Sequence, residues 1–462
     1  MPGDIQEKGF LMGRDKRYLT ITFGCQANEF DTEVLAGILE SLGYRPATDP
    51  VEADIIVINT CAVRRKPEEK VAALLGRLRT LKESKEDLVI AVGGCMVQQP
   101  AVAADLARRF RFVNLFFGTH ALPRFPQLLR QAIGNGRPLI DIDENGDCRE
   151  GLPVRRSSSF HAWVPVIYGC NNFCSYCIVP YVRGRERSRP FDEIIREVRS
   201  LAGEGYLEIT LLGQNVNSYG HDLGEGRDFA ALLGELDRIE GLSRIRFLTS
   251  HPKDLSPRLI EVMRSGNKIC EHLHLPAQAG SNRILERMNR RYTREHYLEL
   301  VENLKEAIPD IALTTDLMVG FPGETEEDFR QTLALLDEAR FDQAFTFIYS
   351  LRSGTQAAEL KKEEIPAGEK RERLRRLARR QNEISLEINR LLVGKTVELL
   401  VEGKSKNNPE MQSGRTRTNK LVHFAAAEDM TGKLVEVEIT AAYTWYLTGK
   451  LVNKVPGTKL TK

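Results

Sequence analysis

Residues Tyr168–Ile178 read YGCNNFCSYCI and follow directly on a strand-like apolar segment, Trp163–Ile167. Strand and helix patterns alternate from there through the middle of the chain, which predicts an α/β fold with this segment as the first of six strands. Six such units correspond to roughly three-quarters of an eight-stranded α/β barrel. We therefore expect a partial (β/α)6 barrel with a cysteine-rich loop after its first strand. The other expected strands are Glu208–Leu212, Arg244–Leu248, His272–Leu275, Ile311–Val319 and Gln343–Ile348.

This loop carries three of the eight cysteines of the chain, Cys170, Cys174 and Cys177, at C-x3-C-x2-C spacing. A structural zinc site takes four ligands, and no fourth thiolate or imidazole stands at an obvious offset nearby. A disulfide framework is not expected in a reducing compartment. Thiolates also hold [4Fe–4S] clusters, and three of them leave one iron open for a substrate or cofactor. We therefore expect these cysteines to bind an iron–sulfur cluster.

A second set of cysteines is spread over residues 16–135, where short apolar strands alternate with helices and predict a doubly wound parallel sheet. Cys25, Cys61 and Cys95 each come just after an expected strand, in the contexts ITFGC, VINTC and AVGGC. The carboxyl ends of parallel strands lie along one edge of a sheet, where ligands bind. We expect the three thiols to converge there and to hold a second [4Fe–4S] cluster. The remaining cysteines, Cys148 and Cys270, are expected to be structural.

The segment GCNNFCSYCIVPY resembles the signature of the radical S-adenosylmethionine superfamily, and the chain resembles the methylthiotransferase family from about Arg17 to Leu451. Further similar segments are RGRERSRP, LLGQNVNSYG, HLHLP and TTDLMVGFPGETEEDF. The resemblance implies that S-adenosylmethionine binds the open iron of the cluster in the cysteine-rich loop and is cleaved to a 5′-deoxyadenosyl radical. It also implies that a second S-adenosylmethionine methylates sulfur at the cluster of Cys25, Cys61 and Cys95.

Within the family, GQNVNSY is most similar to the branch that acts on N6-isopentenyladenosine in tRNA. The resemblance thus implies addition of a methylthio group at C2 of that base in an anticodon loop. Methylthiolation of threonylcarbamoyladenosine in tRNA, or of an aspartate of a ribosomal protein, stays open as an alternative. A non-catalytic iron–sulfur RNA-binding protein is an alternative of a different class. No catalytic side chain is predicted.

Four segments are expected along the chain: an N-terminal domain at 16–135, a polar linker at 136–159, the core barrel at 160–384 and a small antiparallel β-barrel at 387–455. The last follows from strand-like alternation, in which Val435, Val437 and Ile439 are interleaved with Glu436 and Glu438. This segment resembles the small RNA-binding barrel, known as a TRAM domain, of tRNA-modifying methylthiotransferases.

Two further groups of site residues are expected. Gly213, Asn215 and Gln278 follow the second and fourth barrel strands, where the superfamily contacts its cofactor. Contacts to tRNA are expected from exposed basic side chains, because arginine suits bidentate binding of phosphate. These residues are Arg183, Arg185, Arg415, Arg417 and Lys420, and the basic amphipathic helix Lys370–Arg380 extends the same surface. Trp445 and Phe424 are read either as core residues or as platforms for bases.

The composition limits the classes of protein to which the chain can belong. Apolar residues make up 42% of the chain and charged residues 28%, and the formal net charge is +2, so nucleic-acid binding has to come from local clusters of charge. No apolar run approaches the roughly 18 residues of a membrane span, and the N-terminus lacks the apolar core of a signal peptide. We expect a cytoplasmic monomer that receives electrons from a donor.

Overall fold

The computed structural model of the chain describes residues 15–62, 65–144 and 149–454. These residues form two compact units. The first comprises the residues up to 157 together with 169–171 and 177–185, and the second comprises the rest. Residues 1–14, for which the absence of a signal peptide was predicted, and Cys148 lie outside the described residues.

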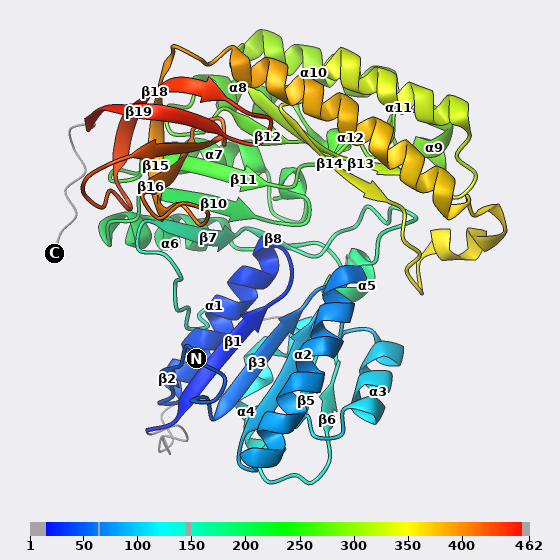
Figure 1. Ribbon diagram of the computed structural model, residues 1–462, viewed down its shortest axis with the longest axis vertical. Helices are drawn as coiled ribbons and strands as arrows, with labels where there is room; N and C mark the ends of the chain where they lie inside the picture. The colour runs from blue at the N-terminus through cyan, green and yellow to red at the C-terminus, as the bar shows by residue number, and fades with distance from the viewer. Residues whose placement is uncertain (1–14, 63–64, 145–148, 455–462) are drawn as a thin grey trace. The chain divides into compact units, whose positions relative to one another are not determined.

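The first unit is built on a parallel six-stranded sheet with the order β2-β1-β3-β4-β5-β6 (Figure 1). The chain leaves β1 for β2 on one side and then crosses to β3 on the other, which confirms the doubly wound prediction. Strands β3 and β4 are buried along their whole length, as expected for central parallel strands. The strands are β1 Arg17–Thr22, β2 Arg45–Pro46, β3 Ile55–Thr60, β4 Val89–Gly94, β5 Leu115–Phe117 and β6 Leu139–Asp141.

Strand β6 lies in the segment that was predicted as a linker. It pairs with β5 through Leu115 and Leu139, so the sheet extends beyond residue 135. The chain after β6 also packs on helix α1, because a Cβ added to Gly37 would lie 2.4 Å from the carbonyl oxygen of Pro153. The helices of this unit are α1 Gln26–Ser41, α2 Arg65–Ser84, α3 Pro100–Arg109 and α4 Phe125–Ala132, the last preceded by the 3-10 helix η1 Thr119–Arg124.

The second unit contains the six parallel strands expected for the core. They form two three-stranded parallel sheets, β11-β10-β7 and β12-β13-β14. An isolated β-bridge between Ile245 of β11 and Ile269, just before β12, connects the two sheets. The expected first strand is divided into β7 and the short β8, and β8 pairs with β9. The strands are β7 His161–Pro165, β8 Ile167–Tyr168, β9 Arg187–Ser188, β10 Glu208–Leu212, β11 Arg244–Leu248, β12 His272–His274, β13 Ala312–Val319 and β14 Gln343–Ile348.

Helices alternate with these strands and bury their apolar faces against them. Leu211, Phe247, Leu273 and Leu317 are at most 2% exposed and belong to one continuous core with residues from the helices. This arrangement confirms the partial (β/α)6 barrel. The helices of this part of the second unit are α6 Phe191–Gly203, α7 Phe229–Asp237, α8 Pro257–Ser265, α9 Asn282–Arg287, α10 Arg294–Ala307 and α11 Glu326–Ala339, with 3-10 helices η2 Val216–Ser218, η3 Pro252–Asp254 and η4 Gln356–Glu363. Helix α5, Val179–Arg183, follows the cysteine-rich loop and belongs to the first unit.

Helix α12, Ala367–Arg390, leads into a closed five-stranded barrel with the order β15-β16-β17-β19-β18 (Figure 1). Val435, Val437 and Ile439 point into this barrel, as their alternation predicted. The prediction of a purely antiparallel barrel is wrong in one respect, because β17 and β19 pair in parallel. The strands are β15 Thr396–Lys404, β16 Met411–Thr416, β17 Leu421–Ala425, β18 Leu434–Ala442 and β19 Leu447–Lys454.

Candidate active site

The first unit brings Cys25, Cys61 and Cys95 to one edge of its sheet. Cys61 and Cys95 directly follow β3 and β4, whose last residues Thr60 and Gly94 are paired. Cys25 follows β1, the neighbour of β3 on its other side, and caps helix α1. Burial raises the pKa of Cys95 to about 11, and the nearby thiols of Cys61 and Cys25 add to that effect. The three thiols therefore converge, at the point where the strand order reverses.

Gly94 makes the turn into Cys95 possible. Its φ of +97° lies in the left-handed region, and a Cβ at this position would lie 2.5 Å from the carbonyl oxygen of Thr60. Only glycine meets both conditions without strain. The short turn keeps Cys95 at the end of the strand, beside Cys61.

A buried arginine donates to this cysteine set. The Nε of Arg183 lies 3.2 Å from Sγ of Cys95, and its Nη2 donates to Oδ1 of Asn28 at 3.2 Å and to Oδ2 of Asp31 at 2.8 Å. Arg149 donates to the other oxygen of Asp31 at 3.0 Å. Arg183 was predicted to contact RNA, but its guanidinium is engaged inside the first unit, which does not support that contact.

The second cysteine set lies in the loop between β8 and α5. The backbone N–H of Cys170 donates to the carbonyl of Gly184 at 3.2 Å. Gly169 has a φ of +70°, and a Cβ there would lie 2.0 Å from the carbonyl oxygen of Arg185. Cys170 and Cys174 are buried, and Cys177 is half-buried. The start of the loop is thus held against the backbone of Gly184 and Arg185.

Cysteine thiolates are the ligands that iron–sulfur clusters take. The seven described cysteines form no disulfide with one another. No group of three or more His, Cys, Asp or Glu side chains in the described residues is arranged to hold one metal ion. In a [4Fe–4S] cluster each thiolate binds a different iron, so the ligands stand farther apart than those of one ion. Binding of a [4Fe–4S] cluster with one open iron by each set of three cysteines remains a prediction.

Unpartnered polar atoms gather on the loops after β10 and β11, at the carboxyl ends of the core strands. The amide of Asn217, the hydroxyl of Ser250, Oδ1 of Asn215 and Nε2 of His251 are buried without a hydrogen-bond partner among the described residues. Buried polar groups in proteins are nearly always satisfied. The set therefore fits a polar ligand, such as S-adenosylmethionine, on the face where barrel enzymes bind substrates.

Two of the three predicted cofactor contacts lie on these loops. Asn215 is 1% exposed and donates from Nδ2 to Asp254 at 2.7 Å, which leaves its carbonyl oxygen available. Gly213 lies against Ile167, because an added Cβ would come within 2.4 Å of that side chain. Gln278 follows β12 in a left-handed conformation with φ of +68°. Cofactor contact by these residues remains a prediction.

Three of the predicted RNA-binding residues lie where the small barrel contacts the core within the second unit. Arg417 forms a bidentate ion pair with Glu271 at 2.7 and 2.8 Å, and Lys420 pairs with Asp342 at 2.5 Å. Arg415 is more exposed and pairs with Glu402 at 3.1 Å. The charges of Arg417 and Lys420 are therefore used inside the protein. RNA contact by Arg185 and Arg415 remains a prediction.

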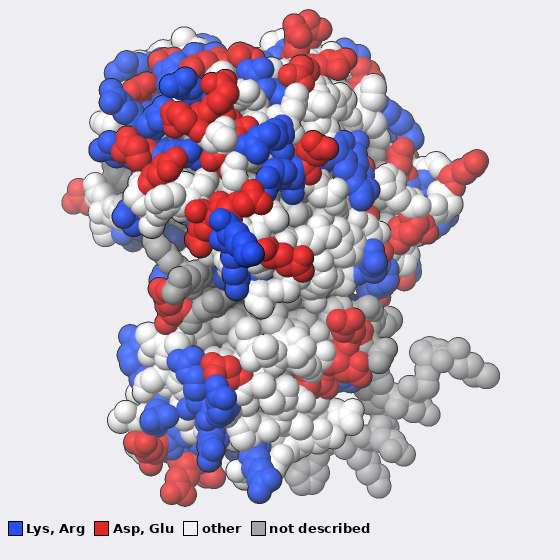
Figure 2. Space-filling view, turned by 90° about the vertical axis from the view of Figure 1, so that its right-hand side faces the viewer, with Lys and Arg blue, Asp and Glu red and all other residues white. Residues whose placement is uncertain are grey.

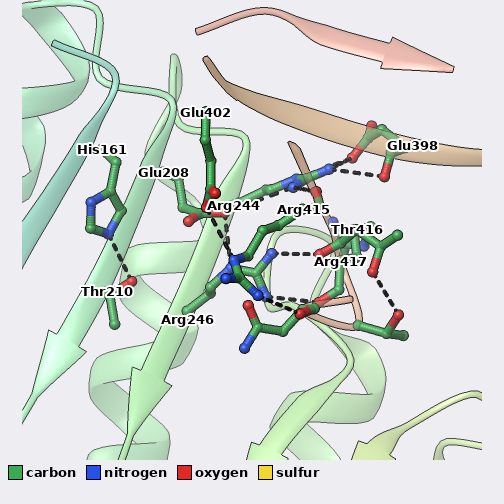
Figure 3. Close-up of polar contacts among 12 residues, drawn as sticks. His161, Glu208, Thr210, Arg244, Arg246, Glu398, Glu402, Arg415, Thr416 and Arg417 are labelled. Atoms are coloured by element: carbon green, nitrogen blue, oxygen red, sulfur yellow. Dashed lines mark hydrogen bonds and ion pairs between the residues drawn. The ribbon is translucent and has the colours of Figure 1, made fainter. Parts of the chain in front are cut away.

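The same contact is anchored by two buried arginines of β11, which Figure 3 shows beside the loop of Arg415, Thr416 and Arg417. Arg244 donates to Glu398 at 2.7 Å and to the carbonyl of Arg415 at 2.8 Å. Arg246 donates to the carbonyl of Thr416 at 2.7 Å and pairs with Glu208 at 2.9 Å. Arg244 is the first residue of β11, and Glu271, the partner of Arg417, directly precedes β12, so the small barrel contacts the amino-terminal ends of the core strands, opposite the loops at their carboxyl ends.

The basic helix Lys370–Arg380 does not form the continuous cationic surface that was predicted. Arg373 is 2% exposed and pairs with Glu324 at 2.6 Å, while Arg376 and Arg380 pair with Glu326 and Asp337. On the face shown in Figure 2, Lys and Arg are interspersed with Asp and Glu. Most of the charge of α12 thus serves intramolecular ion pairs.

Aromatic side chains at the small barrel divide into two kinds. Phe424 is fully buried in the barrel core, whereas Trp445 is 63% exposed. Tyr443 and Tyr446 stack with ring centroids 4.5 Å apart. Trp445 and Tyr446 line a pocket with Arg415. Trp445 is therefore a candidate platform for a base.

Comparison with known proteins matches most of the chain. Residues 17–118 match the model described as Uncharacterized protein family UPF0004, residues 164–336 match the Radical SAM superfamily, and residues 390–452 match the TRAM domain. A relative in Acetivibrio thermocellus named tRNA-2-methylthio-N(6)-dimethylallyladenosine synthase is 54% identical over 95% of this chain and 92% of its own length. The chain belongs to this synthase family. A member in Desulforamulus reducens is also 54% identical, over 96% of both chains.

A solved structure supports the fold of the family. The radical S-adenosylmethionine methyltransferase TsrM from Kitasatospora setae, solved with cobalamin and a [4Fe–4S] cluster, has a TM-score of 0.54 at 15% identity and covers 86% of this chain and 80% of its own. Family membership also confirms the predicted cofactors, [4Fe–4S] clusters and S-adenosylmethionine. Within the described residues, no helix is both long enough and apolar enough to cross a membrane.

Several residues of the site were missed from the sequence. Asn28 and Asp31 lie in the first turns of α1, right after Cys25, and their position alone gave no signal of a contact with Arg183. Asn217 and His251 follow barrel strands, and that position on the ligand-binding face was a usable signal. Arg290, which donates to Cys174 at 3.5 Å, lies far from the cysteine loop in sequence.

Proposed function

We propose that this chain adds a methylthio group at C2 of N6-isopentenyladenosine in the anticodon loop of tRNA. The observation that carries the proposal is the 54% identity to tRNA-2-methylthio-N(6)-dimethylallyladenosine synthases over nearly the whole chain. The two sets of three cysteines support it, because the first follows the parallel strands β1, β3 and β4 and the second lies in the loop after the first barrel strand, β7 with its continuation β8. Breaking an unactivated aromatic C–H bond requires more than acid–base chemistry at neutral pH, which suits a cofactor-based radical reaction.

The residues of the chain have distinct roles in this proposal. Cys170, Cys174 and Cys177 hold the cluster that binds S-adenosylmethionine, and Cys25, Cys61 and Cys95 hold the auxiliary cluster. When bound, these groups supply one-electron chemistry and the methylthio group. Asn217, Ser250 and His251 orient polar parts of the ligand, and their burial excludes water. The target base leaves its stack to reach this face.

The small barrel and its neighbours serve tRNA binding. Exposed Trp445 offers a stacking surface, and Arg415 and Arg185 lie on segments that suit phosphate contacts. The enzyme acts in the cytoplasm, where its tRNA substrate is found, and as a monomer. A separate protein supplies the electrons.

Mass spectrometry of nucleosides tests the proposal. In cells without the gene, 2-methylthio-N6-isopentenyladenosine should disappear from tRNA and its precursor without the methylthio group should accumulate. A plasmid copy should restore the product, and a copy with Cys174→Ala should not. If that nucleoside persisted while the threonylcarbamoyl product or a ribosomal aspartate product vanished, the substrate would be another one.

A further inference from the structure

Arg290 is a buried cation directed at the central cysteine of the radical S-adenosylmethionine motif. It is 4% exposed, and its Nη1 lies 3.5 Å from Sγ of Cys174. Its other donors reach the carbonyl of Pro276 at 2.6 Å and the hydroxyl of Tyr292 at 3.0 Å. Both of these acceptors are uncharged, so neither neutralises the guanidinium.

The charge of Arg290 has no carboxylate partner among the described residues. Buried arginines elsewhere in this chain do: Arg183 pairs with Asp31, Arg244 with Glu398 and Arg373 with Glu324. An isolated buried charge is costly unless it is paired. The group that faces Arg290 is the thiol of Cys174, which becomes a thiolate when it binds iron. The anionic cluster is therefore the missing counter-charge.

The backbone around Arg290 is shaped to hold this contact. Asn289 and Arg291, on either side of it, both have a φ of +56°, and Phe173, just before Cys174, has a φ of +46°. Such conformations cost on the order of 1 kcal/mol for residues other than glycine and persist only where the surroundings enforce them. The strained turn directs the side chain of Arg290 back to the cysteine loop.

Hydrogen bonds tie the two segments together. The N–H of Ser175 donates to the carbonyl of Met288 at 3.0 Å, and its hydroxyl donates to the carbonyl of Arg287 at 2.8 Å. The side-chain amide of Asn289 donates to the carbonyl of Phe173 at 3.0 Å. The residues on both sides of Cys174 are thus clamped to the turn that carries Arg290, so the cation keeps a fixed place.

We propose that Arg290 sets the reduction potential of the cluster held by Cys170, Cys174 and Cys177. One-electron reduction makes this cluster more negative by one charge. A fixed cation and an N–H···S hydrogen bond both stabilise the reduced form and raise the potential. Arg183, beside Cys95, shares its charge with Asp31, so its electrostatic effect on the other cluster is smaller. The inference rests on the proposed function, because it requires a cluster at these cysteines.

Potentiometric titration with dithionite, followed by EPR of the reduced cluster, tests this role. The full-length chain carries Cys25→Ala, Cys61→Ala and Cys95→Ala, so that a single cluster remains after anaerobic reconstitution with ferrous iron and sulfide. In this background Arg290→Gln should shift the midpoint potential to a more negative value at unchanged iron content. Arg290→Lys keeps the charge but has fewer hydrogen-bond donors, so its midpoint potential should lie between those of the parent and of Arg290→Gln. Arg283→Gln, on helix α9 just before the turn that carries Arg290, is the control, because Arg283 pairs with Asp328, and it should titrate like the parent.

Three outcomes would overturn the inference or its basis. An unchanged midpoint potential in Arg290→Gln with full iron content would exclude tuning while leaving the proposed function intact. Loss of iron from both Arg290→Gln and Arg290→Lys would assign Arg290 to structural support alone. Absence of a four-iron cluster from the parent background would contradict the proposed function itself.

Discussion

The Nε of Arg183 donates to Sγ of Cys95 across 3.2 Å, although the two residues are 88 positions apart in the sequence. The contact joins the segment that follows the C-x3-C-x2-C motif to the cysteine set of the N-terminal sheet, within one compact unit. Asn28 and Asp31, on the helix that starts after Cys25, complete the surroundings of the guanidinium. A side chain next to one cysteine motif thus forms part of the environment of the other.

Asp31→Asn should destabilise the first unit strongly. The substitution keeps the shape but leaves Arg183 and Arg149 buried without a carboxylate, and breaking a buried ion pair costs about 3–5 kcal/mol. Thermal unfolding of the apo protein measures the effect. Asp105→Asn is the matched control, because Asp105 also has two arginine partners but lies at the surface, and it should unfold like the wild type. Equal midpoints for the two variants would contradict the structural role of Asp31.

Iron analysis should separate the two cysteine sets. Anaerobically reconstituted protein should hold about eight irons per chain, as two cubes. Replacement of Cys170, Cys174 and Cys177 by alanine should leave about half of this, and so should replacement of Cys25, Cys61 and Cys95. Cys270→Ala is the control, since that buried thiol lies just before β12, outside both cysteine sets, and the variant should leave the iron content unchanged. Full iron content in either triple variant would exclude the corresponding cluster.

His251 should make the protein less stable in mild acid. Burial lowers the pKa of His251 to about 2, and the charges of Arg290, Lys253 and Arg291 add to the shift. The unfolded chain takes up a proton near pH 6.5, whereas the folded chain does not, so stability falls as the pH drops below that value by about 1.4 kcal/mol per pH unit.

Comparison of unfolding at pH 7.5 and pH 5.5 measures this contribution. His251→Gln should lose less stability between the two pH values than the wild type does. His221→Gln, at an exposed position, should keep the dependence of the wild type. If the wild type and His251→Gln lost the same amount, the imidazole would be protonated in the folded state.

Glu398→Ala should show that the small barrel stabilises the core. Arg244 has no exposed side-chain surface, and this substitution removes its main carboxylate partner, which should cost about 3 kcal/mol of unfolding free energy. Glu402 is on the same strand as Glu398, β15, and forms a partly exposed ion pair with Arg415. Glu402→Ala breaks this pair and should cost less than about 1 kcal/mol of unfolding free energy. Similar losses of unfolding free energy in the two variants would mean that the buried contact stabilises the protein no more than the exposed pair does. Deletion of the whole barrel is a less specific test, because it also removes the partners of Arg246.

Trp445→Ala and Arg415→Gln should weaken tRNA binding in different ways. Loss of a stacking surface should cost about 1–3 kcal/mol of affinity without changing its salt dependence. Loss of a phosphate contact should lower the slope of log K against log salt by about one. Fluorescence anisotropy with an anticodon stem–loop at several salt concentrations distinguishes them. Unchanged affinity in both variants would mean that tRNA does not bind to this face of the small barrel.

The local sequence determined the elements and the cysteine positions of this protein. Strand and helix periodicity predicted the six core strands, and β10, β11 and β14 have the predicted bounds. The thiols of Cys25, Cys61 and Cys95 could be placed on one edge because successive parallel strands end on the same side. These properties depend on neighbours a few residues apart, which a single sequence displays directly.

Only the tertiary structure decided the partners of the charged side chains. Arg417 was expected to face RNA and instead pairs with Glu271, 146 positions away, and Arg290 reaches Cys174 across 116 positions. An arginine reads the same in sequence whether it is solvated, ion-paired or directed at a thiol. Its role depends on burial, because a charge removed from water needs a nearby partner. That partner comes close only when strands and helices that are distant in sequence pack together.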